Sequence, residues 1–73
     1  MSTATTEVTI RLNGEAFQIP LGATLAELVR RLELAEDRVA VEVNRRIVRR
    51  PQWPETRIDA GASIEIVQIV GGG

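Results

Sequence analysis

Residues 7–19 read EVTIRLNGEAFQI, and this stretch decides the fold. Polar and apolar residues alternate from Glu7 to Leu12, which is the period of a half-buried strand. Asn13-Gly14 follows directly and favours a two-residue hairpin turn, because both residues tolerate positive φ. Glu15 to Ile19 then returns as a second strand. The apolar residues of both strands are expected to face inward: Val8, Ile10, Leu12, Phe17 and Ile19.

A short helix is predicted after the hairpin. Thr24-Leu25-Ala26-Glu27 is a capping box, in which the Thr24 hydroxyl accepts the Glu27 N–H and the Glu27 carboxylate reaches back. Four apolar residues then recur at helical spacing and form one face: Leu25, Leu28, Val29 and Leu32. We expect the helix to run from about Leu25 to Glu33, and Leu34 to Arg38 to be a loop.

Three further strands are expected in the second half of the chain. Val39 to Val43 reads as the third strand, and Asn44-Arg45-Arg46 as a turn into a short fourth strand, Ile47-Val48. After a turn at Asp59-Ala60-Gly61, residues 63–70 form the last strand. The sequence therefore predicts a mixed sheet of four to five strands with one main helix packed on one face. This is an α+β architecture with the outline of a β-grasp, or ubiquitin-like, fold.

The segment between the fourth and last strands contains Pro51, Trp53 and Pro54, and it is too rich in proline for a regular element. We expect Trp53 to anchor this segment on the core. No repeat or linker divides the chain. The predicted organisation is a disordered N-terminus over residues 1–6, a β-grasp domain over 7–70 and a flexible tail over 71–73.

Composition excludes most catalytic chemistry. The 73 residues include no cysteine and no histidine, and the nine basic residues are all arginine. Without these side chains, a metal site and an independent enzyme are not expected, because the usual ligands and general bases are missing. A net charge of −1 argues against nucleic-acid binding. No stretch has transmembrane length, so a cytoplasmic protein without membrane contact is expected.

The chain ends on Val70-Gly71-Gly72-Gly73, directly after the last strand. Glycines without Cβ make a slim tail that fits a narrow channel, and three residues reach about 10 Å when extended. One interpretation is a terminal carboxylate, on Gly73, that is itself the reactive group. The other is a frayed chain end or a linker without function.

The second half of the chain resembles the ThiS family, the ubiquitin-like sulfur carriers of thiamine (thiazole) biosynthesis. The resemblance covers nearly the whole chain from Val8 onward, and two departures, Arg49 and Gly61-Ala62, fall in loops. Its most specific part is this series of segments: Val39-Ala40-Val41-Glu42-Val43-Asn44, Ile47-Val48-Arg49-Arg50, Gln52-Trp53, Asp59-Ala60-Gly61, Ile64-Glu65-Ile66-Val67 and the terminal glycines.

The resemblance implies a carrier that enzymes act on. An E1-like adenylyltransferase would use ATP and Mg²⁺ to convert the Gly73 carboxylate to an acyl-adenylate, so that the carrier itself binds no cofactor. A cysteine desulfurase or another sulfur donor would then supply sulfur to give a thiocarboxylate. Thiazole synthase would take this sulfur into the thiazole ring. Gly71 and Gly72 would form the tail that presents Gly73.

A docking surface is expected beside the tail. If Ile64 and Ile66 face the core, then Glu65, Val67 and Ile69 point to the face that the helix does not cover. Apolar residues on such a face are typical of an interaction site, so we predict that these three contact partners, together with one face of strand 39–43. The alternative is that they are scattered apolar residues of the kind that any protein surface carries. Glu42 and Glu65 are also candidates for pairing with arginines.

Four arginines, Arg45, Arg46, Arg49 and Arg50, lie around the short fourth strand. They either complement an acidic partner or are simply solvated.

Three other functions stay open on these residues. The small subunit of molybdopterin synthase is also a sulfur carrier that ends in Gly-Gly. A ubiquitin-like modifier would form isopeptide bonds with target amines. A β-grasp interaction module would have an inert tail, and only this module should function after deletion of Gly72 and Gly73.

Overall fold

The computed structural model describes residues 6–69 of the chain. Five strands lie in this range: β1 (Glu7–Leu12), β2 (Glu15–Pro20), β3 (Val39–Val43), β4 (Arg46–Val48) and β5 (Ser63–Gln68). One α-helix, α1 (Leu25–Arg31), follows the first hairpin. Two short 3₁₀ helices, η1 (Glu36–Arg38) and η2 (Arg50–Glu55), precede β3 and follow β4.

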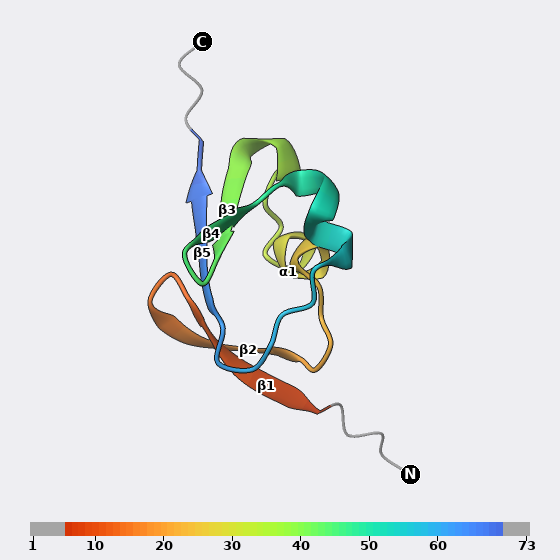
Figure 1. Cartoon of the computed structure of the whole chain (residues 1–73), viewed down its shortest axis with the longest axis vertical. Helices are drawn as coiled ribbons and strands as arrows, with labels where there is room; N and C mark the ends of the chain where they lie inside the picture. Colours follow the sequence, from red (N-terminus) through yellow and green to blue (C-terminus); the bar gives the residue numbers. More distant parts are fainter. Residues whose placement is uncertain (1–5, 70–73) are drawn as a thin grey trace.

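The strands form a single mixed sheet in the order β2-β1-β5-β3-β4. β1 and β5 run parallel at the centre, and the other neighbours are antiparallel. Figure 1 shows α1 on one side of this sheet, with η2 beside it. The predicted α+β class, a mixed sheet with one main helix on one face, is therefore confirmed.

The hairpin that joins β1 and β2 has the predicted two-residue turn. Leu12 pairs with Glu15, and the turn residues between them take φ of 52° at Asn13 and 86° at Gly14. Gly14 adopts the left-handed conformation without the steric cost that a Cβ would bring. This turn sets the register that buries Ile10 and Ile19 and half-buries Val8, Leu12 and Phe17.

The capping box forms as predicted, but α1 is shorter than expected. Glu27 N–H donates to Thr24 Oγ1 at 3.2 Å, and Thr24 N–H donates to Glu27 Oε1 at 2.8 Å. The helix ends at Arg31 rather than Glu33, because Leu32 is its C-cap and Glu33 takes φ of 58°. A left-handed residue ends a helix, and glycine is its usual signal. Here the position is a glutamate, so the sequence hid the boundary.

The core lies between α1 and the inner face of the sheet. α1 contributes Leu25, Leu28 and Val29, all fully buried. Trp53 of η2 is only 2% exposed, and its Nε1–H donates to the Val48 carbonyl at 2.8 Å. The buried residues are Ile10, Ile19, Ala23, Leu25, Leu28, Val29, Val39, Val41, Trp53, Ile58, Ala62 and Ile64. Trp53 thus anchors its segment on the core, as expected.

Two segments predicted to be irregular form 3₁₀ helices instead. The expectation that the segment with Pro51, Trp53 and Pro54 is too rich in proline for a regular element was wrong. Pro51 occupies the first turn of η2, where an N–H needs no helical partner. Thr56 closes this helix, since its N–H donates to the Trp53 carbonyl and its Oγ1–H to the Gln52 carbonyl. Residues 36–38, within the predicted loop, form η1.

The last strand is shorter than predicted. β5 ends at Gln68, and Val70, predicted to end the strand, lies outside the described residues. Of the N-terminal residues predicted to be disordered, residues 1–5 lie outside the described residues. Thr6 precedes β1, and its carbonyl accepts a hydrogen bond of 2.9 Å from the Leu21 N–H. Within residues 6–69, no helix is both long and apolar enough to cross a membrane.

Candidate functional site

Two of the three predicted docking residues, Glu65 and Val67, lie on β5, and the strand alternates as expected. Ile64 is fully buried and Ile66 half-buried on the side of the sheet that packs against α1. Glu65 and Val67 are exposed on the opposite side, and Val67 exposes 55% of its surface. Ile69, one residue beyond the strand, exposes 53%. Neighbouring apolar side chains that are exposed on one face are typical of an interaction site.

The neighbouring strands extend this surface. Val67 lies opposite Ala40 of β3, and Glu65 lies opposite Glu42, which in turn lies opposite Ile47 of β4. We call this surface the outer face, and it consists of Ala40, Glu42, Ile47, Glu65 and Val67. The residues of strand 39–43 that lie on this face are Ala40 and Glu42.

The outer face contains one residue that sequence reasoning missed. Ile47 is 71% exposed, the most exposed of the large apolar residues in the described part of the chain. The two-residue turn at Asn44-Arg45 sets Val43 opposite Arg46, which places Val48 toward the core and Ile47 outward. The expected turn of three residues, Asn44-Arg45-Arg46, was one residue too long, because Arg46 is the first residue of β4. A hairpin turn fixes which face each following residue takes, so this error hid the outward position of Ile47.

The register sets the two glutamates of the outer face against each other. Glu42 and Glu65 were candidates for pairing with arginines, but the structure sets them directly opposite each other across β3 and β5. Like charges at such positions repel and destabilise a sheet modestly. The acidic centre of the outer face is thus set beside the apolar pair of Val67 and Ala40.

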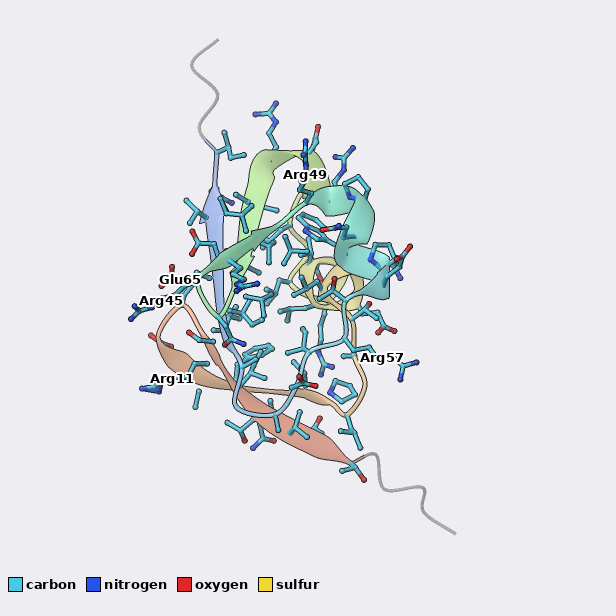
Figure 2. All side chains as sticks on the ribbon, in the orientation of Figure 1. Arg11, Arg45, Arg49, Arg57 and Glu65 are labelled. Atoms are coloured by element: carbon cyan, nitrogen blue, oxygen red, sulfur yellow. The ribbon has the colours of Figure 1, made fainter. Side chains whose placement is uncertain are left out.

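The four arginines near β4 do not form one cluster. Arg45 lies in the turn before β4 and Arg49 lies after it, and Figure 2 shows the two at opposite ends of the strand. All four arginines are exposed. A single acidic patch on a partner would have to span the length of β4 to meet both ends. The four arginines therefore do not make a compact binding site.

The end of β5 leads directly toward the tail. Ile69 N–H donates to the Arg38 carbonyl at 2.7 Å, which fixes the last described residue beside the start of β3. Figure 1 shows this end of β5 on the side of the molecule away from the start of β1. The predicted tail residues Gly71, Gly72 and Gly73 lie outside the described residues.

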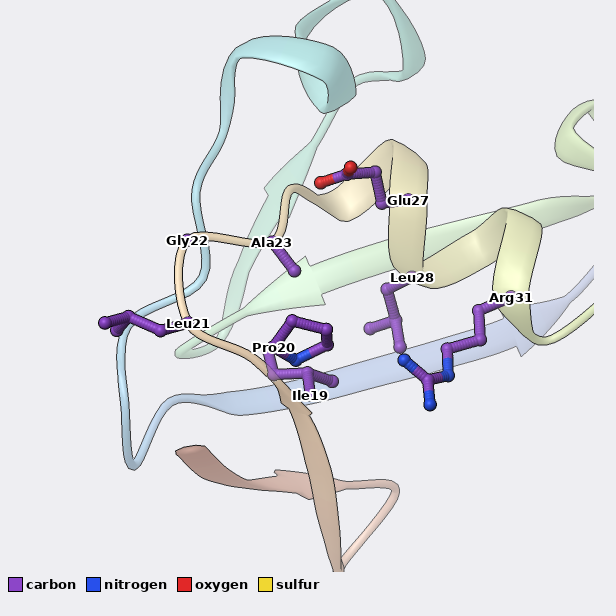
Figure 3. Close-up of a pocket in the computed structure, with 8 residues that line it drawn as sticks. All are labelled: Ile19, Pro20, Leu21, Gly22, Ala23, Glu27, Leu28 and Arg31. Carbon is purple, nitrogen blue, oxygen red and sulfur yellow. The ribbon is translucent and has the colours of Figure 1, made fainter. Parts of the chain in front are cut away.

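A shallow hollow lies on the side of the molecule opposite the outer face. It measures about 280 Å³ and lies between α1 and the loop that follows β2 (Figure 3). Its walls are mainly apolar, and its two charged residues are Glu27 and Arg31. Glu27 already accepts the Thr24 N–H of the capping box. The hollow therefore offers no pair of free catalytic groups, and we assign it no role in chemistry.

Within residues 6–69, no group of histidine, cysteine, aspartate or glutamate side chains is placed to hold a metal ion. What the described part of the chain offers is an exposed sheet face beside the strand that leads to the tail. The fold and this surface define a small ubiquitin-like protein of the β-grasp class.

Comparisons with known proteins agree with this class. The model of the ThiS family matches residues 10–73. The sulfur carrier protein ThiS of Escherichia coli (strain K12) is 33% identical over 64 residues, which cover 88% of this chain and 97% of that protein. The crystal structure of the thiamine biosynthesis protein (ThiS) from Geobacter metallireducens superposes with a TM-score of 0.79. It is 25% identical, and the match covers 90% of this chain and 100% of that one.

A third relative is a larger protein. The thiazole synthase of Magnetococcus marinus is 38% identical over 64 residues, which cover 88% of this chain but only 20% of that protein. The chain belongs to the ThiS family, the sulfur carriers of thiamine biosynthesis. It is therefore a small carrier protein and not itself an enzyme.

Proposed function

We propose that the Gly73 carboxylate is the group that carries sulfur, as a thiocarboxylate made from an acyl-adenylate. The observation that supports this most is that the family match runs through the terminal glycines to residue 73. The described structure adds that β5 leads toward this tail with two exposed apolar residues, Val67 and Ile69, at its end.

The chemistry follows from the weakness of a carboxylate as an electrophile. A Gly73 oxygen attacks the α-phosphorus of ATP on an adenylating enzyme, pyrophosphate leaves, and a mixed anhydride forms. The terminal sulfur of a persulfide then attacks the carbonyl carbon and AMP leaves. A thiol cleaves the resulting disulfide and releases the thiocarboxylate. ATP, Mg²⁺ and every catalytic side chain belong to the partners, which suits a chain without histidine, cysteine or lysine.

Thiazole synthase is the proposed recipient of the sulfur. A thiazole synthase that contains a region similar to this chain supports the pairing, because a carrier-like sequence then occurs in the same polypeptide as a thiazole synthase. The related protein of Escherichia coli is named as the sulfur carrier protein ThiS, and the similar solved structure is named as a thiamine biosynthesis protein (ThiS). These relatives favour the thiazole pathway over the molybdopterin pathway. The outer face, together with Ile69, is the proposed surface on which partner enzymes dock, the adenylating enzyme among them.

The test is the intact mass of the protein after incubation with the adenylating enzyme of the same organism, ATP, Mg²⁺ and a cysteine-desulfurase sulfur source. We expect a gain equal to the replacement of one oxygen by sulfur, mapped to Gly73 by fragmentation. Omission of ATP and deletion of Gly72-Gly73 are the controls, and both should abolish the gain. An unchanged mass with active enzymes would contradict the proposal, and adducts on lysines of other proteins would indicate a modifier instead.

A further inference from the structure

The central pair of strands, β1 and β5, stops pairing before β5 ends. Their parallel register contains only Arg11 with Ser63 and Leu12 with Ile64. Arg11 N–H donates to the Ala62 carbonyl at 2.9 Å, and Asn13 N–H donates to the Ile64 carbonyl at 2.8 Å. The chain then turns into the hairpin, so β1 supplies no main chain beside the second half of β5. Among the strands, only β3 pairs with this half, and Figure 1 shows the β1–β2 hairpin at the other end of β5.

The side chain of Asn13 makes the last hydrogen bond on this side. Ile66 N–H donates to Asn13 Oδ1 at 2.8 Å, in the place where a carbonyl of a longer β1 would accept. Among residues 6–69, no main-chain or side-chain hydrogen bond reaches β5 from this side beyond Ile66. Asn13 therefore marks the point at which β5 becomes an open edge.

The alternation of the sheet shows which groups are open. In the antiparallel pair of β3 and β5, Asn44 N–H donates to the Ser63 carbonyl and Ile69 N–H to the Arg38 carbonyl. Odd-numbered residues of β5 therefore direct their N–H and C=O toward β3, and even-numbered residues direct theirs the opposite way. The Ile66 carbonyl and both main-chain groups of Gln68 thus point to the side that β1 has left.

This open edge lacks the protection of the two outer edges. Strands at the edge of a sheet usually carry charges, proline or a very short length, which prevents pairing with other chains. β2 has Glu15 and Pro20 at its ends, and β4 is only three residues long with Arg46 among them. Residues 66–69 read Ile-Val-Gln-Ile, without a charge or a proline.

We propose that an extended main-chain segment of thiazole synthase pairs with this edge of β5, adding a strand beside Ile66 to Gln68. The proposal rests on the proposed function, since it names how the recipient of the sulfur holds the carrier. Unpaired main-chain N–H and C=O groups recognise another extended main chain, and added strands are a known mode of peptide binding. Such a strand would lie next to the residues that lead to Gly73, so it would aim the tail as well as hold it.

A second copy of this chain is a poorer occupant. The open edge offers three main-chain groups, and two such edges facing each other would make very few hydrogen bonds. Short two-stranded pairs are marginal without further burial. An enzyme that also accepts the tail brings additional contacts in sequence order, directly beyond Ile69.

The test compares Gln68→Pro with Gln68→Ala in binding to thiazole synthase by calorimetry. Proline removes the N–H that points to the open edge and places a ring there, whereas alanine keeps the N–H and removes only the side chain. We expect Gln68→Pro to weaken binding about tenfold or more and Gln68→Ala to change it less than twofold. Both variants should keep the thermal midpoint of the wild type, because neither breaks a hydrogen bond to β3.

Hydrogen exchange of single amides provides a readout that does not depend on a variant. We expect the Gln68 amide to be unprotected in the free protein and protected in the complex. The Ile69 amide, bonded to Arg38, is the control that should be protected in both.

Three results would overturn the added strand while leaving the carrier function intact: equal binding by all proteins, equal weakening by both variants, or a homodimer that only Gln68→Pro disrupts. A wild-type protein that does not bind thiazole synthase at all would overturn the proposed partner and the added strand together.

Discussion

Two asparagines in the hairpin turns hold β5 from both sides. Asn13 Oδ1 accepts the Ile66 N–H at 2.8 Å, and Asn44 Oδ1 accepts the Ser63 N–H at 3.0 Å. Each also has positive φ, 52° and 51°, which asparagine tolerates better than most residues. The turn signal in the sequence predicted the hairpins, but the bonds across to β5 span 53 and 19 residues of sequence. No local pattern contains them.

Replacing Asn13 separates these two roles. Asn13→Gly keeps the positive φ and removes the acceptor, so we expect a loss of about 1 kcal/mol in the free energy of unfolding. Asn13→Asp is the matched control, because aspartate also tolerates this conformation and keeps an acceptor oxygen. Urea denaturation measures both. Equal stability of Asn13→Gly and the wild type would show that the bond to Ile66 contributes nothing.

Arg45 also takes a positive φ, 71°, but an arginine side chain does not favour this left-handed conformation as asparagine does. The left-handed conformation costs an ordinary residue roughly 1–2 kcal/mol. Glycine removes this cost but loses about 0.5–1 kcal/mol through its freer unfolded chain. We therefore expect Arg45→Gly to raise the free energy of unfolding by about 0.5 kcal/mol. Arg46→Gly, within β4, should instead lower the free energy of unfolding. Urea denaturation of both variants measures the two changes.

At the scale of elements, local rules predicted those parts whose signals are contained in a few neighbouring residues. Thr24 to Glu27 marked the start of α1, and the alternation in β1 and β5 assigned their inner and outer faces correctly. The rules failed where tertiary contacts decide. η2 exists because Trp53 is held in the core through Val48. The outward position of Ile47 and the pairing of Glu42 with Glu65 needed the register between strands.

The facing glutamates of β3 and β5 make a prediction about the sheet. Like charges directly opposite destabilise a strand pair by about 0.2–1 kcal/mol, so Glu65→Gln should stabilise the free protein by about 0.5 kcal/mol. The gain should shrink in 1 M salt, which screens exposed charges. Glu15→Gln, opposite the apolar Leu12, is the control and should change little. A destabilised Glu65→Gln protein would mean that an arginine pairs with Glu65 after all.

At the scale of the whole molecule, the sheet divides the protein into a side that makes the fold and a side that is free for partners. The side covered by α1 and η2 holds nearly all of the buried residues, while the outer face carries exposed apolar groups without a cover in the described chain. The sequence could predict both sides, since alternation distinguishes them. It could not predict that β1 leaves β5 early, because that depends on where Asn13 meets Ile66.

A charge on the outer face tests this division. Val67→Asp changes a side chain that is 55% exposed, so the thermal midpoint should stay close to that of the wild type. An aspartate facing an apolar partner surface must lose water without a partner charge, which strongly opposes docking. We therefore expect formation of the thiocarboxylate to fall by more than about tenfold in the mass assay. Leu21→Asp is the matched control: Leu21 is 64% exposed but lies in the loop after β2, at the opposite edge of the sheet from β4. Normal sulfur loading of the Val67→Asp protein, or equal losses in both variants, would mean that the outer face does not dock the adenylating enzyme.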